Sequence, residues 1–354
     1  MELKDLIISF SSIMTISGFA SRSADEAEAL LGKYFDECKR DRVGNLCFIK
    51  RSTRPLEEGE KRAKILIDAH FDEIGMIVTD IKEGGFLTVT NIGGIDSSIL
   101  QASDVVIYGK EKIFGVIAST PPHLSTPDDR NKLKSVSDLL IDTGYSKEAL
   151  EKIVRIGTPV GYANVYSEMQ NGKICGKALD DKACAACAAY AISNIPADEL
   201  YGDVYLLLSI FEETGGGGVV PAAFGIEPDY AMVIDVDLAA VPDAKKPTSI
   251  EMGKGPSITY TTATDINLTK MLHRLAKEAE IPAQKFVSAA STGTNSVRLH
   301  LAGNGVPVVD VGLPLVFMHS ATEIVDLKDC ESLGKLVELF VKNVEIGKEY
   351  TCNE

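Results

Sequence analysis

The sequence contains no uninterrupted apolar run of about 18 residues, so it predicts no membrane-spanning helix. Basic residues are also scarce, because 36 Lys and Arg stand against 51 Asp and Glu, for a formal net charge of −15. Such a chain repels phosphate backbones, so nucleic acid is a poor partner.

The 7 cysteines are scattered, and only Cys184 and Cys187 form a CxxC. A zinc ribbon needs a second CxxC, so we expect these two in the core and the protein in a reducing, cytoplasmic compartment.

The composition is that of a soluble globular protein. The 354 residues suffice for about two domains, and 45% of them are hydrophobic. Apolar residues repeat at helical spacing from Leu3 to Phe10, which favours an amphipathic first helix over a signal peptide. Ser23 to Glu26 is typical of a capping box and predicts a second helix that extends through Cys38.

Helices and short apolar strands alternate in the first and last parts of the chain. This order predicts an α/β fold with a mixed, largely parallel sheet and helices on both faces. We expect strands at residues 46–50, 64–68, 203–211, 230–235 and 306–311, and helices at 181–194, 265–280 and 327–346.

The central part of the chain has a different texture. Short β-like runs at residues 75–79, 86–91, 104–109 and 113–119 are separated by glycine turns, with one helix near residues 135–140. The sequence therefore predicts a catalytic α/β domain of residues 1–73 and 167–354, interrupted by a small β-rich domain of residues 74–166. The strands of the insert are expected to present edges that another subunit covers.

Side chains of metal-ligand type follow the apolar strands or open the helix after them. Alone, each has an ordinary interpretation as a helix cap, a surface charge or a structural histidine. Because ligands bind beyond the carboxyl ends of strands in open α/β sheets, these residues should converge at one edge. Acidic groups that end apolar strands are costly to bury unless they are paired or bind metal. The set comprises His70, Asp180, Asp181, Glu212, Glu213, Asp235 and His319.

This set predicts a two-metal hydrolase. Two histidines and three carboxylates can hold two zinc-class ions roughly 3.5–4 Å apart, with one carboxylate shared between them. A further carboxylate is needed as a general base. The adjacent Glu212 and Glu213 can divide these tasks, one binding metal while the other faces the water.

The order of these residues resembles that of the co-catalytic zinc aminopeptidases. The segment from Ala69 to Gly75 is similar to the AHxDEIG signature of the tetrahedral, or glutamyl, aminopeptidase group. The resemblance implies the zinc aminopeptidase fold, an insert used for dimerisation and a homo-oligomer between a dimer and a dodecamer. Further matching motifs lie at residues 41–45, 93–96, 121–124, 178–181, 211–213, 233–236 and 318–320.

The resemblance also implies a set of metal ligands. His70 and Asp235 would bind one ion, and Glu213 and His319 would bind the other. Asp180 would bridge the two ions, because it matches the first acidic residue of the family motif. The expected cofactor is two divalent ions per chain, zinc by preference, with cobalt and manganese as alternatives.

Three neighbouring acids take other roles by the same resemblance. Glu212 would be the general base and proton shuttle. Asp72 would lie behind His70, accept its free ring N–H and fix the tautomer. Asp181 would support the start of the following helix.

The sequence departs from the family pattern away from the ligands and the base. Lys182 stands where arginine is commoner, and Ala321 replaces a proline. Three segments differ as well, namely Thr214–Gly218, Thr294–Ser296 and Val316–Phe317. Because these positions are expected around the substrate pocket and the subunit contacts, they bear on specificity and assembly more than on catalysis.

The favoured hypothesis is a metal-dependent aminopeptidase that acts on peptides with a free N-terminus. A carboxypeptidase or deacylase with the same metal chemistry is an alternative, separated by the requirement for a free amine. A polysaccharide hydrolase needs two carboxylates about 5–9.5 Å apart and leaves the histidines unexplained. An inactive scaffold is opposed by the intact ligands and Glu212. The preferred N-terminal residue and the native metal do not follow from the sequence.

Overall fold

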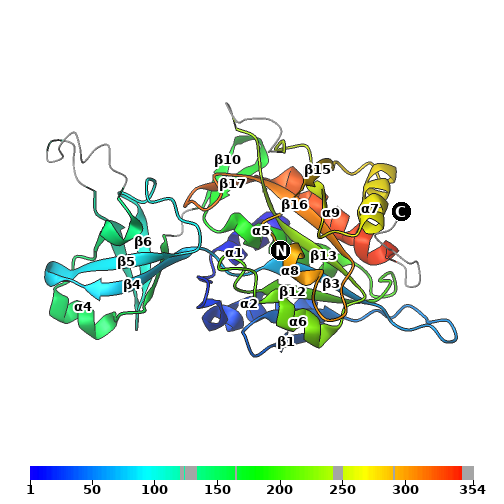
Figure 1. Ribbon diagram of the computed structural model, residues 1–354, viewed down its shortest axis with the longest axis horizontal. Helices are drawn as coiled ribbons and strands as arrows, with labels where there is room; N and C mark the ends of the chain where they lie inside the picture. The colour runs from blue at the N-terminus through cyan, green and yellow to red at the C-terminus, as the bar shows by residue number, and fades with distance from the viewer. Residues whose placement is uncertain (120–122, 124–133, 164–165, 242–249, 290–291, 345–354) are drawn as a thin grey trace.

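The computed structural model describes residues 1–119, 123, 134–163, 166–241, 250–289 and 292–344. Within them the chain forms a large layered α/β body and a smaller β-barrel, which lie side by side (Figure 1). This arrangement confirms the predicted mixed α/β fold with an added small β unit. Of the predicted motif at residues 121–124, only His123 lies within the described residues.

The large sheet of the described residues has 11 strands, and its centre is parallel. The neighbours β12, β3, β13 and β16 run parallel, and antiparallel strands extend the sheet on both sides. Strands with both faces covered carry apolar runs, as β3 does at residues 65–67 and β12 at residues 204–208. The spatial order is β1 (Glu37–Arg40), β2 (Leu46–Lys50), β12 (Asp203–Ser209), β3 (Lys64–His70), β13 (Tyr230–Leu238), β16 (Val308–Val316), β17 (Glu323–Asp326), β11 (Lys173–Gly176) and β10 (Ser167–Met169), with β14 (Ser257–Thr261) on β16 and β15 (Gln284–Ser288) on β14.

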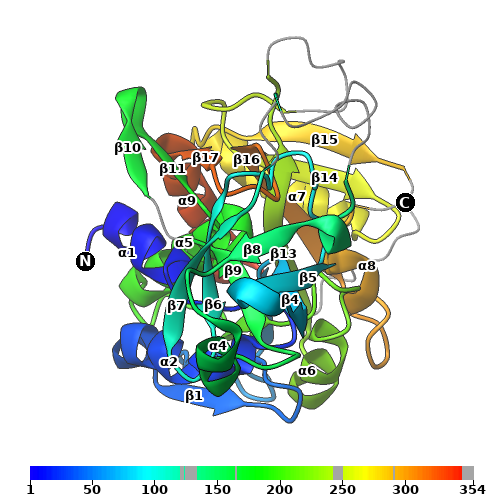
Figure 2. The ribbon, with the colours of Figure 1, turned by 90° about the vertical axis from the view of Figure 1, so that its left-hand side faces the viewer.

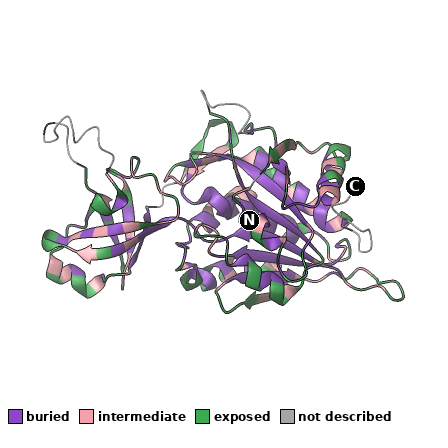
Figure 3. Ribbon diagram, in the orientation of Figure 1, coloured by how far each residue is buried: buried purple, intermediate pink, exposed green. Residues whose placement is uncertain are grey.

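Helices cover both faces of this sheet, and its central strands are buried (Figure 3). Two separate hydrophobic cores lie between the layers. The central helix α5 is rich in alanine, and Cys184 and Cys187 are buried in it, as predicted. No helix of the described part is long and apolar enough to cross a membrane. One face carries α1 (Leu3–Ser11), α2 (Ala24–Leu31), α5 (Leu179–Asn194), α7 (Ile266–Glu278) and α9 (Leu327–Asn343), and the other carries α6 (Val219–Ile226) and α8 (Ser296–Leu299).

The barrel has a core of its own and closes on itself (Figure 2). Because closure removes free strand edges, the prediction that another subunit covers open edges of these strands is wrong. The helix α4 (Lys147–Ile153) packs on the outside. The antiparallel order is β4 (Gly75–Ile81), β5 (Phe86–Ile92), β8 (Leu140–Asp142), β7 (Lys112–Ile117), β6 (Asp104–Tyr108) and β9 (Pro159–Tyr162).

Two predicted helices are shorter than expected. The helix predicted through Cys38 ends at Leu31, because the chain from Glu37 to Arg40 pairs with β2. The Ser23 side chain makes no capping hydrogen bond. The helix predicted near residues 135–140 is one 3-10 turn, η5 (Val136–Asp138). Further 3-10 turns lie at η1 (Ala20–Ser23), η2 (Gly32–Tyr34), η3 (Glu83–Gly85) and η6 (Gln170–Gly172).

A buried ionic cluster ties the start of the barrel to the α/β body. Glu73 Oε1 accepts from Lys182 Nζ at 3.1 Å, and its other carboxylate oxygen accepts from Lys177. The Thr15 backbone N–H also donates to Glu73, at 2.8 Å. Burial opposes the charge on Glu73, but the two ammonium groups lower its pKa to about 2. The cluster therefore holds three chain segments through charges that have no access to water.

We expect Glu73→Gln to destabilise the fold strongly, because it leaves two ammonium groups buried without a counter-charge. Removing one partner of a buried ion pair costs about 3–5 kcal/mol. Urea unfolding followed by circular dichroism measures this loss. The matched control is Glu83→Gln, since Glu83 pairs with Lys147 on the surface and is 84% exposed. Equal stability of the two variants would contradict the structural role of the cluster.

Candidate metal centre

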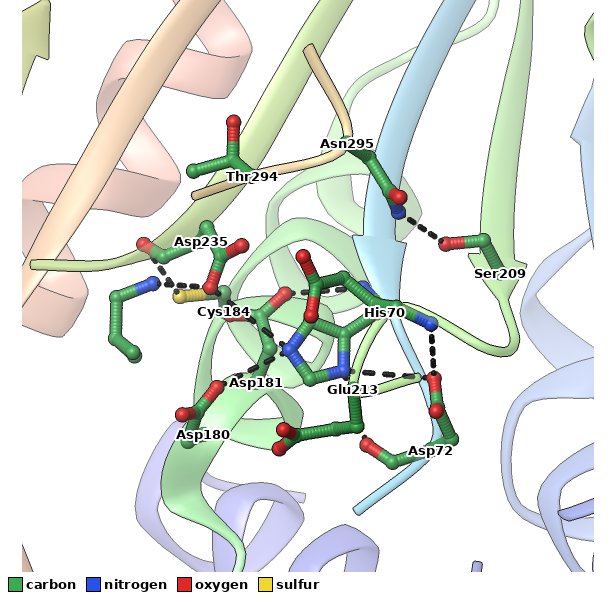
Figure 4. Close-up of polar contacts among 12 residues, drawn as sticks. His70, Asp72, Asp180, Asp181, Cys184, Ser209, Glu213, Asp235, Thr294 and Asn295 are labelled. Carbon is green, nitrogen blue, oxygen red and sulfur yellow. Dashed lines mark hydrogen bonds and ion pairs between the residues drawn. The ribbon is translucent and has the colours of Figure 1, made fainter. Parts of the chain in front are cut away.

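The predicted ligand residues meet at the carboxyl ends of the central strands. Figure 4 shows four of them, His70, Asp180, Glu213 and Asp235, gathered at this edge. The register of the parallel strands produces this convergence. Val233 of β13 pairs with Asp68 of β3, so Asp235, two residues further along β13, lies at the level of His70. Ser209 at the end of β12 also pairs with His70, so the turn after β12 starts next to it. The first turn of α5 brings Asp180, and the loop between β16 and β17 brings His319.

Asp180 occupies the middle of the cluster. Its Oδ1 lies 3.1 Å from His70 Nε2, and its Oδ2 lies 3.4 Å from His319 Nε2. Asp235 Oδ1 lies 3.8 Å from His70 Nε2, and Glu213 Oε2 lies 3.4 Å from His319 Nε2. The two oxygens of Asp180 thus face two different histidines, and each histidine has a second carboxylate beside it.

The acids of this cluster are buried without a matching positive charge. No Lys or Arg in the described part of the chain forms an ion pair with Asp180, Glu213 or Asp235. Burial raises the pKa of Asp235 and of Glu213 well above the usual range. Burial alone would also raise the pKa of Asp180, but hydrogen bonds with His319 and His70 lower it.

The donor set fits divalent cations. Buried carboxylates are costly unless paired or bound to a metal, and imidazoles with carboxylates are ligands of zinc-class ions. Ligand atoms of His70, Asp181 and Asp235 all lie within 4.8 Å of one another, and those of His70, Asp180 and Glu213 do so as well. The described residues thus contain two groups of the size that holds one ion.

Asp181 makes a contact that sequence reasoning did not anticipate. It stands in the first turn of α5, and no side chain makes a capping hydrogen bond there. Its Oδ2 accepts the backbone N–H of His70 at 3.0 Å. The peptide bond between Asp180 and Asp181 is cis. Support of the helix start by Asp181 stays a prediction, and its carboxylate also holds the end of β3.

Asp72 lies behind His70 as predicted, but it uses a different atom. His70 Nδ1 makes its hydrogen bond to the backbone carbonyl of Asp72 at 2.9 Å, and the Asp72 carboxylate stands 3.7 Å away. That carboxylate accepts the backbone N–H of Glu212 at 3.1 Å. Asp72 therefore orients the histidine through its main chain and the glutamate pair through its side chain (Figure 4).

A tight turn after β12 presents Glu212 and Glu213. Phe211 adopts φ 67°, a left-handed conformation that is costly for a residue with a side chain and that clusters at functional sites. Glu212 lines the cavity beside the ligand cluster. Burial raises the pKa of Glu212, and the neighbouring carboxylates of Asp180 and Asp72 raise it further.

Sequence reasoning missed Glu323, the first residue of β17. Its buried carboxylate accepts three backbone N–H groups, from Leu179 at 2.7 Å, Asp180 at 3.1 Å and His319 at 2.9 Å. It therefore fixes two ligand segments that are far apart in the sequence. A charged residue at the start of a short apolar strand was the available signal, but no motif marked it.

The insert also reaches the cluster, through the loop after β5. A Cβ added at Gly94 would lie 2.9 Å from His319 Nδ1, so only glycine allows the loop to approach this ligand so closely. Gly93 adopts φ 77°, and a Cβ added there would lie 2.8 Å from Ile74 Cγ2. The predicted motif at residues 93–96 therefore has a steric basis.

A cavity of about 790 Å³ opens from the ligand cluster. Of the segments that depart from the family pattern, Gly215, Gly216 and Thr294 line it, as expected for a substrate pocket. Lys182 does not line it, because it belongs to the buried Glu73 cluster. Beyond the metal-ligand residues, the wall includes Asp237, Leu238, Phe286, Ser288, Val297 and Arg298.

Comparisons with known proteins agree with this geometry. A model of the M42 glutamyl aminopeptidase family matches residues 52–336. The lysyl aminopeptidase of Pyrococcus furiosus is 30% identical over 315 residues, which cover 88% of each chain. A TET aminopeptidase from the marine sediment archaeon Thaumarchaeota archaeon SCGC AB-539-E09 has 31% identity and a TM-score of 0.89, over 97% of both chains.

A second solved structure bears on assembly. The TET1 peptidase of Pyrococcus horikoshii, which can assemble into a tetrahedron or a large octahedral shell, has 28% identity and a TM-score of 0.83, over 97% of this chain and 100% of that chain. The family model spans most of the sequence, and the solved relatives share the whole fold. This chain therefore belongs to the M42 glutamyl aminopeptidase family and is a peptide-bond hydrolase.

Proposed function

We propose that this protein is a two-metal aminopeptidase. His70 and Asp235 would hold one divalent ion, Glu213 and His319 the other, and Asp180 both. The observation that carries the proposal is the position of the Asp180 carboxylate, which faces a different histidine with each oxygen in a buried cluster of acids. Zinc is the expected metal, with cobalt and manganese as alternatives.

The residues divide the chemistry among themselves. When bound, the ions would supply polarisation of the scissile carbonyl and a lowered pKa of the attacking water. Glu212 would accept a proton from that water and return it to the leaving amine, and its raised pKa suits this exchange. Asp72 would hold Glu212 in position through its backbone N–H. The acidic end of the cavity favours the α-ammonium group of a peptide with a free N-terminus.

The insert of residues 74–166 would serve assembly as well as the site. Its described strands form a closed barrel without a free edge, so contact between subunits would use side chains on the outer surface. Phe114 on β7 is 56% exposed and Ile156 is 67% exposed, and large apolar groups outside are common at interfaces. We propose a homo-oligomer between a dimer and a dodecamer.

The metal requirement is tested by reconstitution. Chelated protein should not hydrolyse leucine p-nitroanilide, and it should regain activity on binding two equivalents of zinc, cobalt or manganese per chain. The N-acetylated substrate should remain intact, because it has no ammonium group for the acidic end of the cavity. Elemental analysis and release of nitroaniline measure both results. Protein that binds no transition metal, or that cleaves only the blocked substrate, would refute the proposal.

The two glutamates should separate base from ligand. Glu212→Gln should keep both ions and lose about 10²- to 10⁴-fold in kcat, because it removes the group that accepts the proton. Glu213→Gln should bind one ion more weakly, because it removes a charged ligand. Metal content and peptide hydrolysis of the two variants, compared side by side, decide between the roles. Metal loss in Glu212→Gln alone would show that the assignments are exchanged.

The surface of the barrel should control oligomer size. Light scattering of the natural protein should give a mass at least twice the 38.0 kDa of one chain. Phe114→Glu should lower this mass, because it places a charge in the proposed barrel contact. Phe224→Glu is the comparison variant, since Phe224 is 73% exposed but lies on α6 of the α/β body. A monomeric natural protein at micromolar concentration would contradict the assembly.

A further inference from the structure

We propose that Asp237 forms a subsite for the basic side chain of the substrate's N-terminal residue, so that peptides beginning with lysine or arginine are preferred. The inference rests on the proposed aminopeptidase function and adds the class of substrate to it. The family description names glutamyl substrates and the Pyrococcus furiosus relative is a lysyl enzyme, so membership alone leaves this class open.

The position of Asp237 follows from the strand that carries it. Asp237 comes two residues after Asp235 on β13, and alternate residues of a strand point to the same face. Both side chains line the same cavity. Two residues of a parallel strand span about 6.6 Å, which is comparable to the reach of the four-carbon stem of lysine. A substrate residue held at the ligand cluster could therefore extend its charged end to Asp237.

The carboxylate of Asp237 has one polar partner among the described residues. Ser257 on β14 donates its hydroxyl to Asp237 Oδ2, and Oδ1 receives no hydrogen bond there. No Lys, Arg or His in the described segments lies within ion-pair distance of Asp237. The nearby Asp310 differs, because Thr294 donates to it at 2.6 Å. Apart from the metal-ligand residues and Glu212, Asp237 is thus the acid lining this cavity whose carboxylate can still accept a cation.

The rest of the wall suits a long aliphatic chain with a charged end. Phe286 and Leu238 border the cavity and offer apolar surface to methylene groups, while Asp237 offers the charge. The one Arg or Lys lining this cavity in the described chain is Arg298, an exposed residue of α8. Its side chain lies beside Gly216, in the turn that follows Glu213. Arg298 therefore lies on a different segment of the chain from Asp237, the acid of the proposed subsite.

A pair of substrates that differ in charge tests the subsite. The reconstituted enzyme should cleave lysine p-nitroanilide with a kcat/KM about 10- to 100-fold above that for norleucine p-nitroanilide, whose side chain lacks the ammonium group. Asp237→Asn should reduce this ratio to near one, and Asp237→Glu should restore part of it. Asp198→Asn removes the same charge from an exposed site and should keep the ratio.

Each other result has a definite meaning. A variant Asp237→Asn that loses activity equally on both substrates would show a structural role or a contact with the α-ammonium group, and it would overturn the subsite. A natural enzyme that prefers glutamate p-nitroanilide would overturn it as well and direct attention to Arg298. Equal rates on the lysine and norleucine substrates would have the same consequence.

Binding separates this inference from the proposed function. Calorimetry on the zinc-loaded Glu212→Gln variant, in which turnover of the amides is slow, should show tighter binding of lysinamide than of norleucinamide, and adding Asp237→Asn should abolish the difference. If no aminoacyl substrate is cleaved but this difference is found, the aminopeptidase mechanism fails while the subsite stands. If peptides are cleaved but both amides bind equally, the subsite fails while the mechanism stands.

Discussion

The concentration of buried carboxylates without a basic partner is the constraint on which the site depends. Asp180, Asp235 and Glu213 repel one another at short range, and only two imidazoles lie among them within the described residues. Two buried lysines, Lys177 and Lys182, donate to Glu73 instead. Because neither forms an ion pair with the ligand acids, the cluster keeps its negative charge for an ion or a substrate amine.

The surrounding contacts hold this unfavourable arrangement in place through the backbone. Glu323 accepts three N–H groups from the segments that carry Asp180 and His319, and Asp181 accepts the N–H of His70. These supporting acids accept hydrogen bonds from main-chain donors, although burial still raises the pKa of both carboxyl groups. These contacts fix the backbone of the segments that carry the metal-ligand side chains, which is the preorganisation that catalysis and tight metal binding require.

Local patterns predicted the parts of the fold that depend on short stretches of chain. The apolar runs before His70 and after Tyr230 gave strands whose ends had to meet, and this placed the ligand types correctly. The remaining features depend on contacts between residues that are far apart in the sequence. Glu37–Arg40 became a strand because β2 lies beside it, and Glu323 acquired its partners only through the tertiary fold. The choice of a backbone carbonyl as the acceptor for His70 also depends on exact loop geometry, which no residue type reveals.

The spacing of the ligand segments has a consequence for folding. Five stretches between His70 and His319 must be joined before the cluster exists, and the parallel strands that join them form only long-range contacts. Such topologies fold slowly, and a partly folded chain offers no complete set of ligands. An ion bound there would stabilise the native state alone. Metal binding would therefore follow the docking of the last strand and shift the folding equilibrium toward the folded protein.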